Sequence, residues 1–135
     1  MQELKTRAQI EQPHIIIITE VNNKHVKVYP EAAVFNIPNF HMHTKNVSQS
    51  GKRGIIIYTH ETLRSASELF SDIEFEEYLA LVLLLGNNQK LLICGIYRSE
   101  SGSDENNTNL NEFLKEMVAK NASINFSLGI LITGI

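Results

Sequence analysis

The sequence predicts one α/β domain, and three observations support this prediction. The chain has 135 residues, of which 43% are hydrophobic and 20% charged, which fits one globular domain and not a disordered chain. Short β-branched runs such as Ile15-Ile16-Ile17-Ile18 are typical of strands that are covered on both faces. A segment beginning near Asn109 has the apolar spacing of an amphipathic helix. We therefore expect a single domain over residues 1–135.

The N-terminal segment predicts a helix followed by a buried strand. Leu4 and Ala8 give residues 2–11 a weak helical stripe, and Pro13 ends it because the residue before a proline avoids the helical conformation. The apolar run at residues 15–19 predicts a strand that stops at Glu20. Since active sites often lie where buried strands end, this carboxylate is a candidate site residue.

The middle of the chain predicts a long loop, a turn and three further strands. Residues 22–50 are rich in proline and asparagine and have one short strand around Phe40-His41-Met42. The turn Gly51-Lys52-Arg53-Gly54 leads into a strand at residues 55–58, and the polar segment 61–70 fits no single element. Two apolar runs follow, and the Asn-containing loop between them predicts that they pair antiparallel. These two runs are residues 75–85 and 90–97.

The C-terminal third predicts a loop, a helix and a last strand. Residues 101–107 are polar, and Asn109 with Glu112 resembles a capping pair that begins a helix. The expected apolar face of this helix comprises Leu110, Phe113, Leu114, Met117 and Val118. An exit loop at 121–125 and an apolar strand at 126–135 complete the chain.

Charge and cysteine content restrict the function only weakly. The net charge of −3, with five histidines, gives no overall basic field, so any nucleic-acid binding would depend on a local patch. The single cysteine, Cys94, excludes an intrachain disulfide and fits a reducing intracellular setting, nuclear or cytoplasmic. No stretch reaches the roughly 18 apolar residues of a membrane span, so we expect no membrane association.

Several short motifs occur in the order found in one family. They are His14-Ile15-Ile16-Ile17-Ile18-Thr19-Glu20, then Gly51-Lys52-Arg53-Gly54-Ile55-Ile56-Ile57-Tyr58, then Leu92-Ile93-Cys94-Gly95-Ile96-Tyr97-Arg98, and then the amphipathic helix. Together they resemble the endonuclease domain of non-LTR retrotransposons, in which it accompanies a reverse transcriptase. This domain belongs to the endonuclease/exonuclease/phosphatase family. The resemblance spans about residues 4–129.

The resemblance implies a four-layer α/β sandwich of the DNase I-like type, with mixed sheets and flanking helices, that hydrolyses DNA phosphodiesters with Mg²⁺. Glu20 would be the metal-binding carboxylate, since a hard cation prefers oxygen ligands. Tyr97 would lie at the active-site rim beside the scissile phosphate, with Arg98 next to it. Lys52 and Arg53 would contact the DNA backbone.

The sequence departs from the family's pattern at positions that carry the chemistry. The family's Gly-Asp-Phe-Asn, which ends a strand, falls at Gly129-Ile130-Leu131-Ile132, so isoleucines replace the aspartate and the asparagine. The family's first strand would precede residue 2, and its closing Asp-His pair would follow Ile135. Loss of one general acid or base typically lowers a rate about 100- to 10,000-fold. We therefore expect a truncated domain that is catalytically inactive as this chain.

Each candidate also has a plainer interpretation. Glu20 and the pair Lys52 and Arg53 could be solvated loop residues, and Tyr97 could be an interfacial aromatic with its hydroxyl group in water. The two imidazoles of His41-Met42-His43 share one strand face, but a third metal ligand is lacking. His60 could be a simple polar residue after a strand. The acidic group is expected to be a solvated loop face, and it comprises Asp72, Glu74, Glu76 and Glu77.

Two other functions remain open at this point. The scaffold could serve as a non-catalytic module that binds nucleic acid or another protein, or the chain could be a translated fragment without function. The apolar segments at 79–85 and 130–132 favour poor folding if they lack neighbouring strands, because unpaired apolar edges aggregate.

Overall fold

The computed structural model describes residues 2–19, 35–46, 54–63, 65–84, 89–97, 104–124 and 126–133. Two helices and seven strands lie within these ranges. They are α1 (Gln2–Glu11), β1 (Ile15–Thr19), β2 (Phe40–Asn46), β3 (Gly54–His60), β4 (Ser65–Leu69), β5 (Tyr78–Leu84), β6 (Lys90–Tyr97), α3 (Asp104–Ile124) and β7 (Phe126–Thr133).

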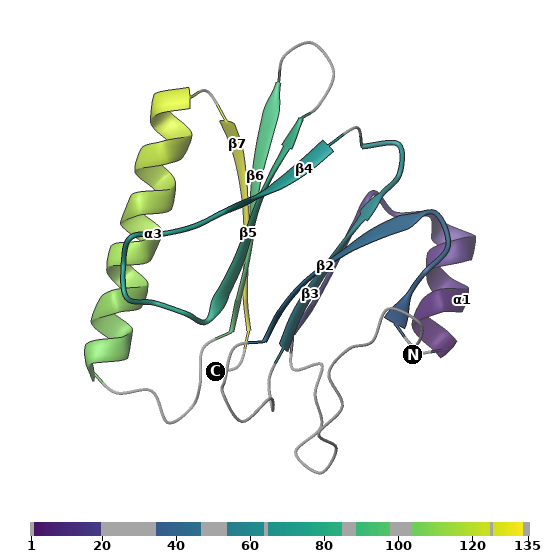
Figure 1. Cartoon of the computed structure of the whole chain (residues 1–135), viewed down its shortest axis with the longest axis horizontal. Coiled ribbons are helices and arrows are strands. Elements are labelled where there is room, and N and C mark those ends of the chain that lie inside the picture. The colour runs from purple at the N-terminus through teal and green to yellow at the C-terminus, as the bar shows by residue number, and fades with distance from the viewer. Residues whose placement is uncertain are drawn as a thin grey trace.

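The described elements form four layers, helix on sheet on sheet on helix (Figure 1). The first sheet has the strand order β1-β3-β2, with both pairs antiparallel, and α1 covers its outer face. The second sheet has the order β4-β5-β6-β7, and α3 covers its outer face. Its first two pairs are antiparallel, whereas β6 and β7 are parallel and are joined through α3. The predicted flanking helices are confirmed, but only the second of the two sheets is mixed, whereas mixed sheets were predicted.

Three buried clusters of side chains correspond to the three interfaces between these layers. The first, between α1 and the first sheet, includes Ala8, Ile56 and Tyr58. The second, between the two sheets, includes Ile55 and Ile57 from β3 together with residues of β5 and β6. The third lies between the second sheet and α3. Successive residues of β3 thus alternate between two cores, which explains why its apolar run is continuous.

The third core is centred on aromatic rings. Phe113 is fully buried on α3, and its ring centroid lies 4.4 Å from that of Tyr78 and 5.3 Å from that of Phe75. Leu110 and Met117 are buried on the same side of the helix, which confirms its predicted apolar face for these positions. Val118 is 53% exposed, so its predicted place on that face is wrong.

The first helix is followed by a residue in the left-handed backbone conformation. Gln12 has a φ of 45°, and its N–H donates to the carbonyl oxygen of Ala8 at 2.9 Å. Pro13 follows and cannot continue a helix, as the sequence predicted. The Gln9 side chain then donates to the carbonyl oxygen of Pro38 at 3.0 Å, which fixes α1 to the segment that precedes β2.

Gly95 lies in β6 at a contact between the two sheets. A Cβ atom at this position would lie 3.1 Å from Cγ2 of both Ile17 and Ile55, which is closer than nine in ten observed Cβ contacts. Glycine therefore permits this approach of β1 and β3 to β6, and any other residue here would require the neighbouring side chains to move.

Residues 70–77 form a strap that runs from β4 to β5 alongside α3 (Figure 1). Ser71 Oγ donates to the Glu116 carboxylate, and Asn109 Nδ2 donates to the Glu74 carbonyl oxygen at 3.0 Å. Asn106 Nδ2 donates to Glu77 Oε1 at 2.8 Å. These bonds attach the strap to α3 over more than two helical turns.

Several predicted boundaries were wrong. The second helix begins at Asp104, not near Asn109, and ends at Ile124, so it includes residues 104–107 and 121–124 of the two predicted loops. The Asn109 side chain is not a cap, because it bonds to the strap. The ambiguous segment 61–70 contains strand β4, and the short strand at Phe40 extends to Asn46. The strand at 15–19 packs against a core on both faces, as predicted, but it is a half-buried edge strand among the described strands.

Candidate functional site

The strand ends that carry the predicted site residues lie at one end of the sandwich, the lower end in Figure 1. There β1 ends at Thr19, β6 ends at Tyr97 and β3 begins at Gly54. Thr19 pairs with Ile55, so the end of β1 lies beside the start of β3. We call this region the strand-end face. The long connections that leave it include residues outside the described ranges.

Four of the five predicted site residues lie outside the described residues. Glu20 directly follows Thr19, Lys52 and Arg53 precede Gly54, and Arg98 directly follows Tyr97. Their side chains are therefore not located. The structure brings together the strand ends to which these residues are attached, and it leaves their individual roles as predictions.

Tyr97 is described, and its side chain is only 2% exposed. It packs in the core between the sheets, and its backbone N–H donates to the carbonyl oxygen of Glu77 at 3.0 Å. The interpretation of Tyr97 as an aromatic with its hydroxyl group in water is therefore wrong. Burial results from strand alternation, since Tyr97 shares the inner face of β6 with Ile93. Its position at a strand end agrees with the sequence analysis.

The last strand, β7, runs parallel to β6 and ends beside Tyr97. Ile130 pairs with Cys94, Ile132 pairs with Ile96, and Thr133 is the residue opposite Tyr97. The four residues aligned with the family's Gly-Asp-Phe-Asn motif thus lie within the strand.

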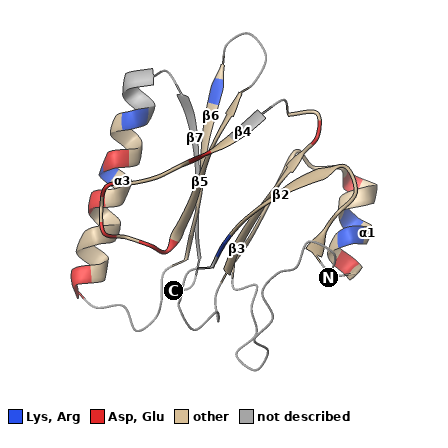
Figure 2. Cartoon of the chain, viewed as in Figure 1, with Lys and Arg blue, Asp and Glu red and all other residues tan. Residues whose placement is uncertain are grey.

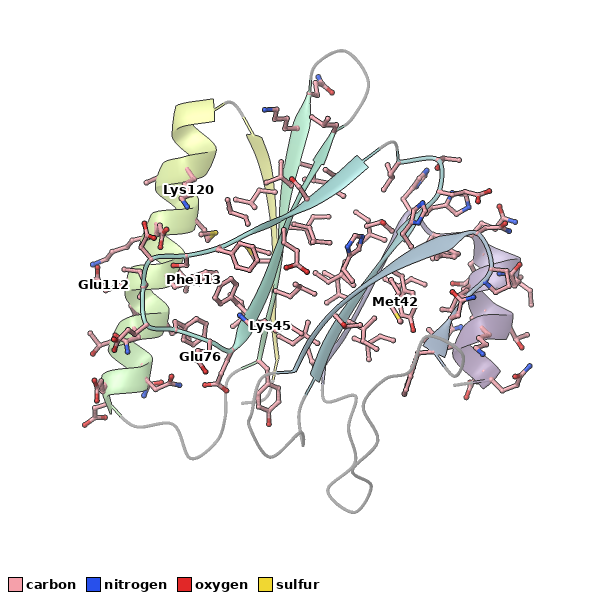
Figure 3. The ribbon with its side chains drawn as sticks, in the orientation of Figure 1. Met42, Lys45, Glu76, Glu112, Phe113 and Lys120 are labelled. Atoms are coloured by element: carbon pink, nitrogen blue, oxygen red, sulfur yellow. The ribbon has the colours of Figure 1, made fainter. Side chains whose placement is uncertain are left out.

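Lys45 is a cation near this face that no sequence motif had indicated. Its Nζ atom lies 3.9 Å from the ring centroid of Tyr78, which is a cation–π contact across the two sheets. Burial lowers the pKa of Lys45, and the carboxylates of Glu76 and Glu68 oppose that change. Figure 3 shows Lys45 and Glu76 near each other at the start of β5. In the sequence, the only indication of a role for Lys45 was its position two residues after His43 and four after His41, which puts the three side chains on one face of a strand.

Only part of the acidic group fits the predicted solvated loop face. Asp72, Glu74 and Glu76 are exposed, as expected. Glu77 is half-buried. Its carboxylate accepts a hydrogen bond from the Asn106 side chain, and its carbonyl oxygen accepts one from the backbone N–H of Tyr97. Glu77 therefore connects the first turns of α3 to the end of β6, and it stabilises the strand-end face.

The histidines serve as local hydrogen-bonding groups. His43 Nε2 lies 3.3 Å from Thr59 Oγ1, and burial lowers the pKa of His43; Glu68 opposes this change and His41 adds to it. His60 Nδ1 lies 2.9 Å from Thr62 Oγ1, and its ring contacts that of Phe40 edge-on. Within the described ranges, no group of three His, Cys, Asp or Glu side chains could hold a metal ion.

The described strand termini at the strand-end face carry no carboxylate, the ligand that Mg²⁺ prefers. The described pairs of β6 and β7 near the strand-end face include Cys94 with Ile130, Ile96 with Ile132 and Tyr97 with Thr133. Aliphatic side chains cannot bind a hard cation, and a thiol is a poor ligand for one. The magnesium site implied by the resemblance is thus not supported by these residues, and no catalytic step follows from them.

Charges in the described part of the chain are spread over the helices and the strap, and the sheets have few (Figure 2). The described ion pairs lie within helices: Arg7 with Glu11 at 3.3 Å, Lys115 with Glu112 at 3.4 Å, and Lys120 with Glu116 at 3.1 Å. Figure 3 labels Glu112 and Lys120 along α3.

Comparisons with known proteins find similarity among solved structures. The sequence matches no protein-family model, and no curated protein matches it. The fold is similar to the crystal structure of truncated Caenorhabditis elegans TDP2, with a TM-score of 0.44 and 9% sequence identity. The match covers 89% of this chain and 49% of that one, so the chain spans about half the length of its neighbour. Within the described residues, no helix is both long and apolar enough to cross a membrane.

Proposed function

We propose that this chain is part of a phosphodiesterase domain of the endonuclease/exonuclease/phosphatase type, related to the endonucleases of non-LTR retrotransposons, and that it does not cleave DNA by itself. The observation that carries this proposal is the meeting of β1, β3 and β6 at one face. Three separate motifs, which contain Glu20, Lys52-Arg53 and Tyr97-Arg98, begin or end at those strand termini.

The proposed roles follow from the chemistry of each residue. Glu20 supplies a carboxylate for a divalent cation, and Arg98 supplies a planar donor that can bind a phosphate with two hydrogen bonds. Lys52 and Arg53 neutralise DNA phosphates without reading the base sequence. Tyr97 fixes the end of β6, since its ring is buried between the sheets.

The apolar character of β7 supports the proposed lack of cleavage. The family requires an aspartate that activates water at the end of this strand, beside the tyrosine. In this chain Ile130 and Ile132 pair with Cys94 and Ile96, and Thr133 lies opposite Tyr97. None of these side chains has the pKa of a general base at neutral pH, so the reaction lacks a proton acceptor among them.

A nicking assay tests the proposal directly. We expect the purified chain to leave supercoiled plasmid intact in the presence of Mg²⁺ or Mn²⁺ over several hours. Glu3→Ala, which removes a carboxylate from α1, is the control. Nicking that disappears with Glu20→Ala but persists with Glu3→Ala would show an active nuclease and contradict the proposed inactivity.

A non-catalytic nucleic-acid-binding module is the second candidate function. It is favoured by the sequence positions of three cations, Lys52, Arg53 and Arg98, next to strand termini that lie at one face. In this case the chain binds DNA in a salt-dependent way. The logarithm of the DNA association constant then falls linearly with the logarithm of the salt concentration. Changing Lys52 and Arg53 to alanine makes this slope shallower by about 0.9 for each DNA phosphate that is no longer neutralised. Lys5→Ala with Arg7→Ala, on α1, is the matched control.

A further inference from the structure

Lys45 lies at the strand-end face, on a strand that carries none of the family motifs. Strand β2 pairs with β3 so that Lys45 is opposite Ile55, and Thr19 of β1 is opposite the same residue from the other side. Neighbouring strands are about 4.8 Å apart, so the backbones of Lys45 and Thr19 are about 10 Å apart across this sheet. Lys45 therefore lies at the same face as the predicted site, at a distance from the end of β1.

The Lys45 side chain points toward the second sheet. Phe40 and Met42 of β2 pack in the core on the α1 side, and successive residues of a strand face opposite sides. Lys45 therefore faces β5, where its Nζ atom lies 3.9 Å from the ring centroid of Tyr78. Figure 3 shows Lys45 between the lower ends of β2 and β5.

The Tyr78 ring that holds this ammonium group is itself fixed. Tyr78 is only 5% exposed, and its ring centroid lies 4.4 Å from that of Phe113 on α3. Its hydroxyl oxygen accepts a hydrogen bond from the backbone N–H of Ser71 at 2.8 Å. A group that is already held in place loses less conformational freedom when it binds a ligand. The Lys45 ammonium is therefore preorganised at this face.

The Tyr78 ring stabilises the charge of Lys45 but is a poor acceptor for its hydrogen bonds. A lysine ammonium has three N–H donors, and the face of an aromatic ring is only a weak acceptor for them. The ion pairs found in the described part of the chain lie within helices and do not involve Lys45. Burial lowers the pKa of Lys45, and the carboxylates of Glu76 and Glu68 only partly offset this effect. An anion that accepts hydrogen bonds from these donors would stabilise the charged form.

We propose that the Lys45 ammonium binds a phosphate group of a nucleic-acid backbone at the strand-end face, with the Tyr78 ring as its support. This inference rests on the nucleic-acid binding proposed above and adds a residue to it. A lysine binds a phosphate as a point charge, so the contact contributes affinity without base specificity. A polyanion is favoured as the ligand because the sequence positions of Lys52, Arg53 and Arg98 are next to strand termini at the same face.

Glu76 provides an internal test, because its carboxylate competes with a bound phosphate for the same cation. Glu76 is exposed, lies near Lys45 in Figure 3 and acts on the charge of Lys45. Glu76→Gln removes this negative charge and should strengthen phosphate binding. Glu112→Gln, which removes an exposed carboxylate from α3, is the matched control.

Binding of a duplex oligonucleotide, measured by fluorescence anisotropy at several salt concentrations, tests the contact. Lys45→Met keeps an apolar stem and removes the charge. Loss of one phosphate contact should make the dependence of log affinity on log salt concentration shallower by about 0.9, which corresponds to roughly eightfold weaker binding at about 0.1 M salt. Lys115→Met removes the same charge from an exposed position on α3 and should leave binding unchanged. Glu76→Gln should tighten binding about twofold or more, and Glu112→Gln should not.

NMR of the lysine side chains in the wild-type chain reports on the ammonium group directly. Inorganic phosphate and the oligonucleotide are added in separate experiments. A bound phosphate should raise the pKa of Lys45, because an adjacent anion favours the charged form, and it should leave the pKa of Lys115 unchanged. This measurement uses no variant, so it decides the question even if Lys45→Met does not fold.

Three results would overturn the proposal. The first is oligonucleotide binding that Lys45→Met weakens no more than Lys115→Met, or that Glu76→Gln does not strengthen; nucleic-acid binding would then stand without Lys45. The second is a pKa of Lys45 that rises with inorganic phosphate but not with the oligonucleotide, which would show an adventitious anion site only. The third is the absence of oligonucleotide binding by the wild-type chain, which would remove the proposed nucleic-acid binding as well.

Discussion

Replacing Gly95 with alanine would add one methyl group at a contact between the two sheets. The new Cβ atom would lie 3.1 Å from Cγ2 of Ile17 and 3.1 Å from Cγ2 of Ile55. Carbon atoms in contact are normally about 3.5–4.0 Å apart, so each distance is too short by at least about 0.4 Å. Both neighbours are β-branched, and their χ1 angles cannot change without cost.

The position of each isoleucine decides the size of the effect. Ile17 lies on the edge strand β1 and can move outward, but Ile55 is fully buried in the central strand β3. Overpacking of this kind typically costs about 1–3 kcal/mol. The reduced freedom of the unfolded chain offsets about 0.4–1 kcal/mol of that cost. We therefore expect Gly95→Ala to lower the free energy of unfolding by about 1–2 kcal/mol.

Urea unfolding followed by far-UV circular dichroism measures this change, and a double-mutant cycle identifies its origin. Ile17→Ala removes one of the clashing methyl groups, so the cost of Gly95→Ala should fall by about 0.5–1 kcal/mol in that background. Ile16→Ala is the matched control, because Ile16 packs on the α1 side of the same strand. A Gly95→Ala variant as stable as the wild type, or equal coupling to Ile16 and Ile17, would refute the reasoning.

Three further predictions concern the core, the strap and the cysteine. Phe113→Ala should lower the free energy of unfolding by about 3–5 kcal/mol, since this fully buried ring contacts Phe75 and Tyr78; a loss below about 1 kcal/mol in urea unfolding would contradict the aromatic core. Partial burial disfavours ionised Glu116, but the hydrogen bond from Ser71 and the interactions with Lys120 outweigh it and lower the pKa of Glu116. The folded state therefore gains stability above the ordinary pKa of 4.5 and loses it as the pH falls. Glu116→Gln should make the free energy of unfolding depend less on pH between neutral and acidic conditions. An unchanged pH profile would count against the contact. Burial raises the pKa of the Cys94 thiol to about 12, so a thiol reagent at neutral pH should modify it only after denaturation, and rapid labelling of native protein would disprove its burial.

The regular elements were the part of the fold that the sequence predicted best. The first helix, the strands at Ile15 and Ile55 and the antiparallel pairing of β5 with β6 were all predicted. These elements follow from local rules, since proline stops a helix and β-branched runs favour strands. The second helix was predicted five residues too short at its start. Polar residues at 104–108 continue the helix there because the strap bonds to Asn106 and Asn109.

The candidate site was predicted only as a set of motifs. Four of its residues lie outside the described part of the chain, and the fifth, Tyr97, is buried where the plainer interpretation had it exposed. Lys45 and Glu77 were not predicted, because their contacts join strand β2 to strand β5 and the strap to α3 and β6. No pattern along the sequence encodes such pairings.

The sequence by itself determined that this protein is an α/β domain with strands at its apolar runs, because periodicity and residue type act over short distances along the chain. Only the tertiary structure decided which strands are central and which are edges. The runs at Ile15 and Ile55 are nearly identical in composition, yet one is half-buried and the other fully buried. The difference depends on how many strands lie beside each run, and that number is set by contacts between distant parts of the chain.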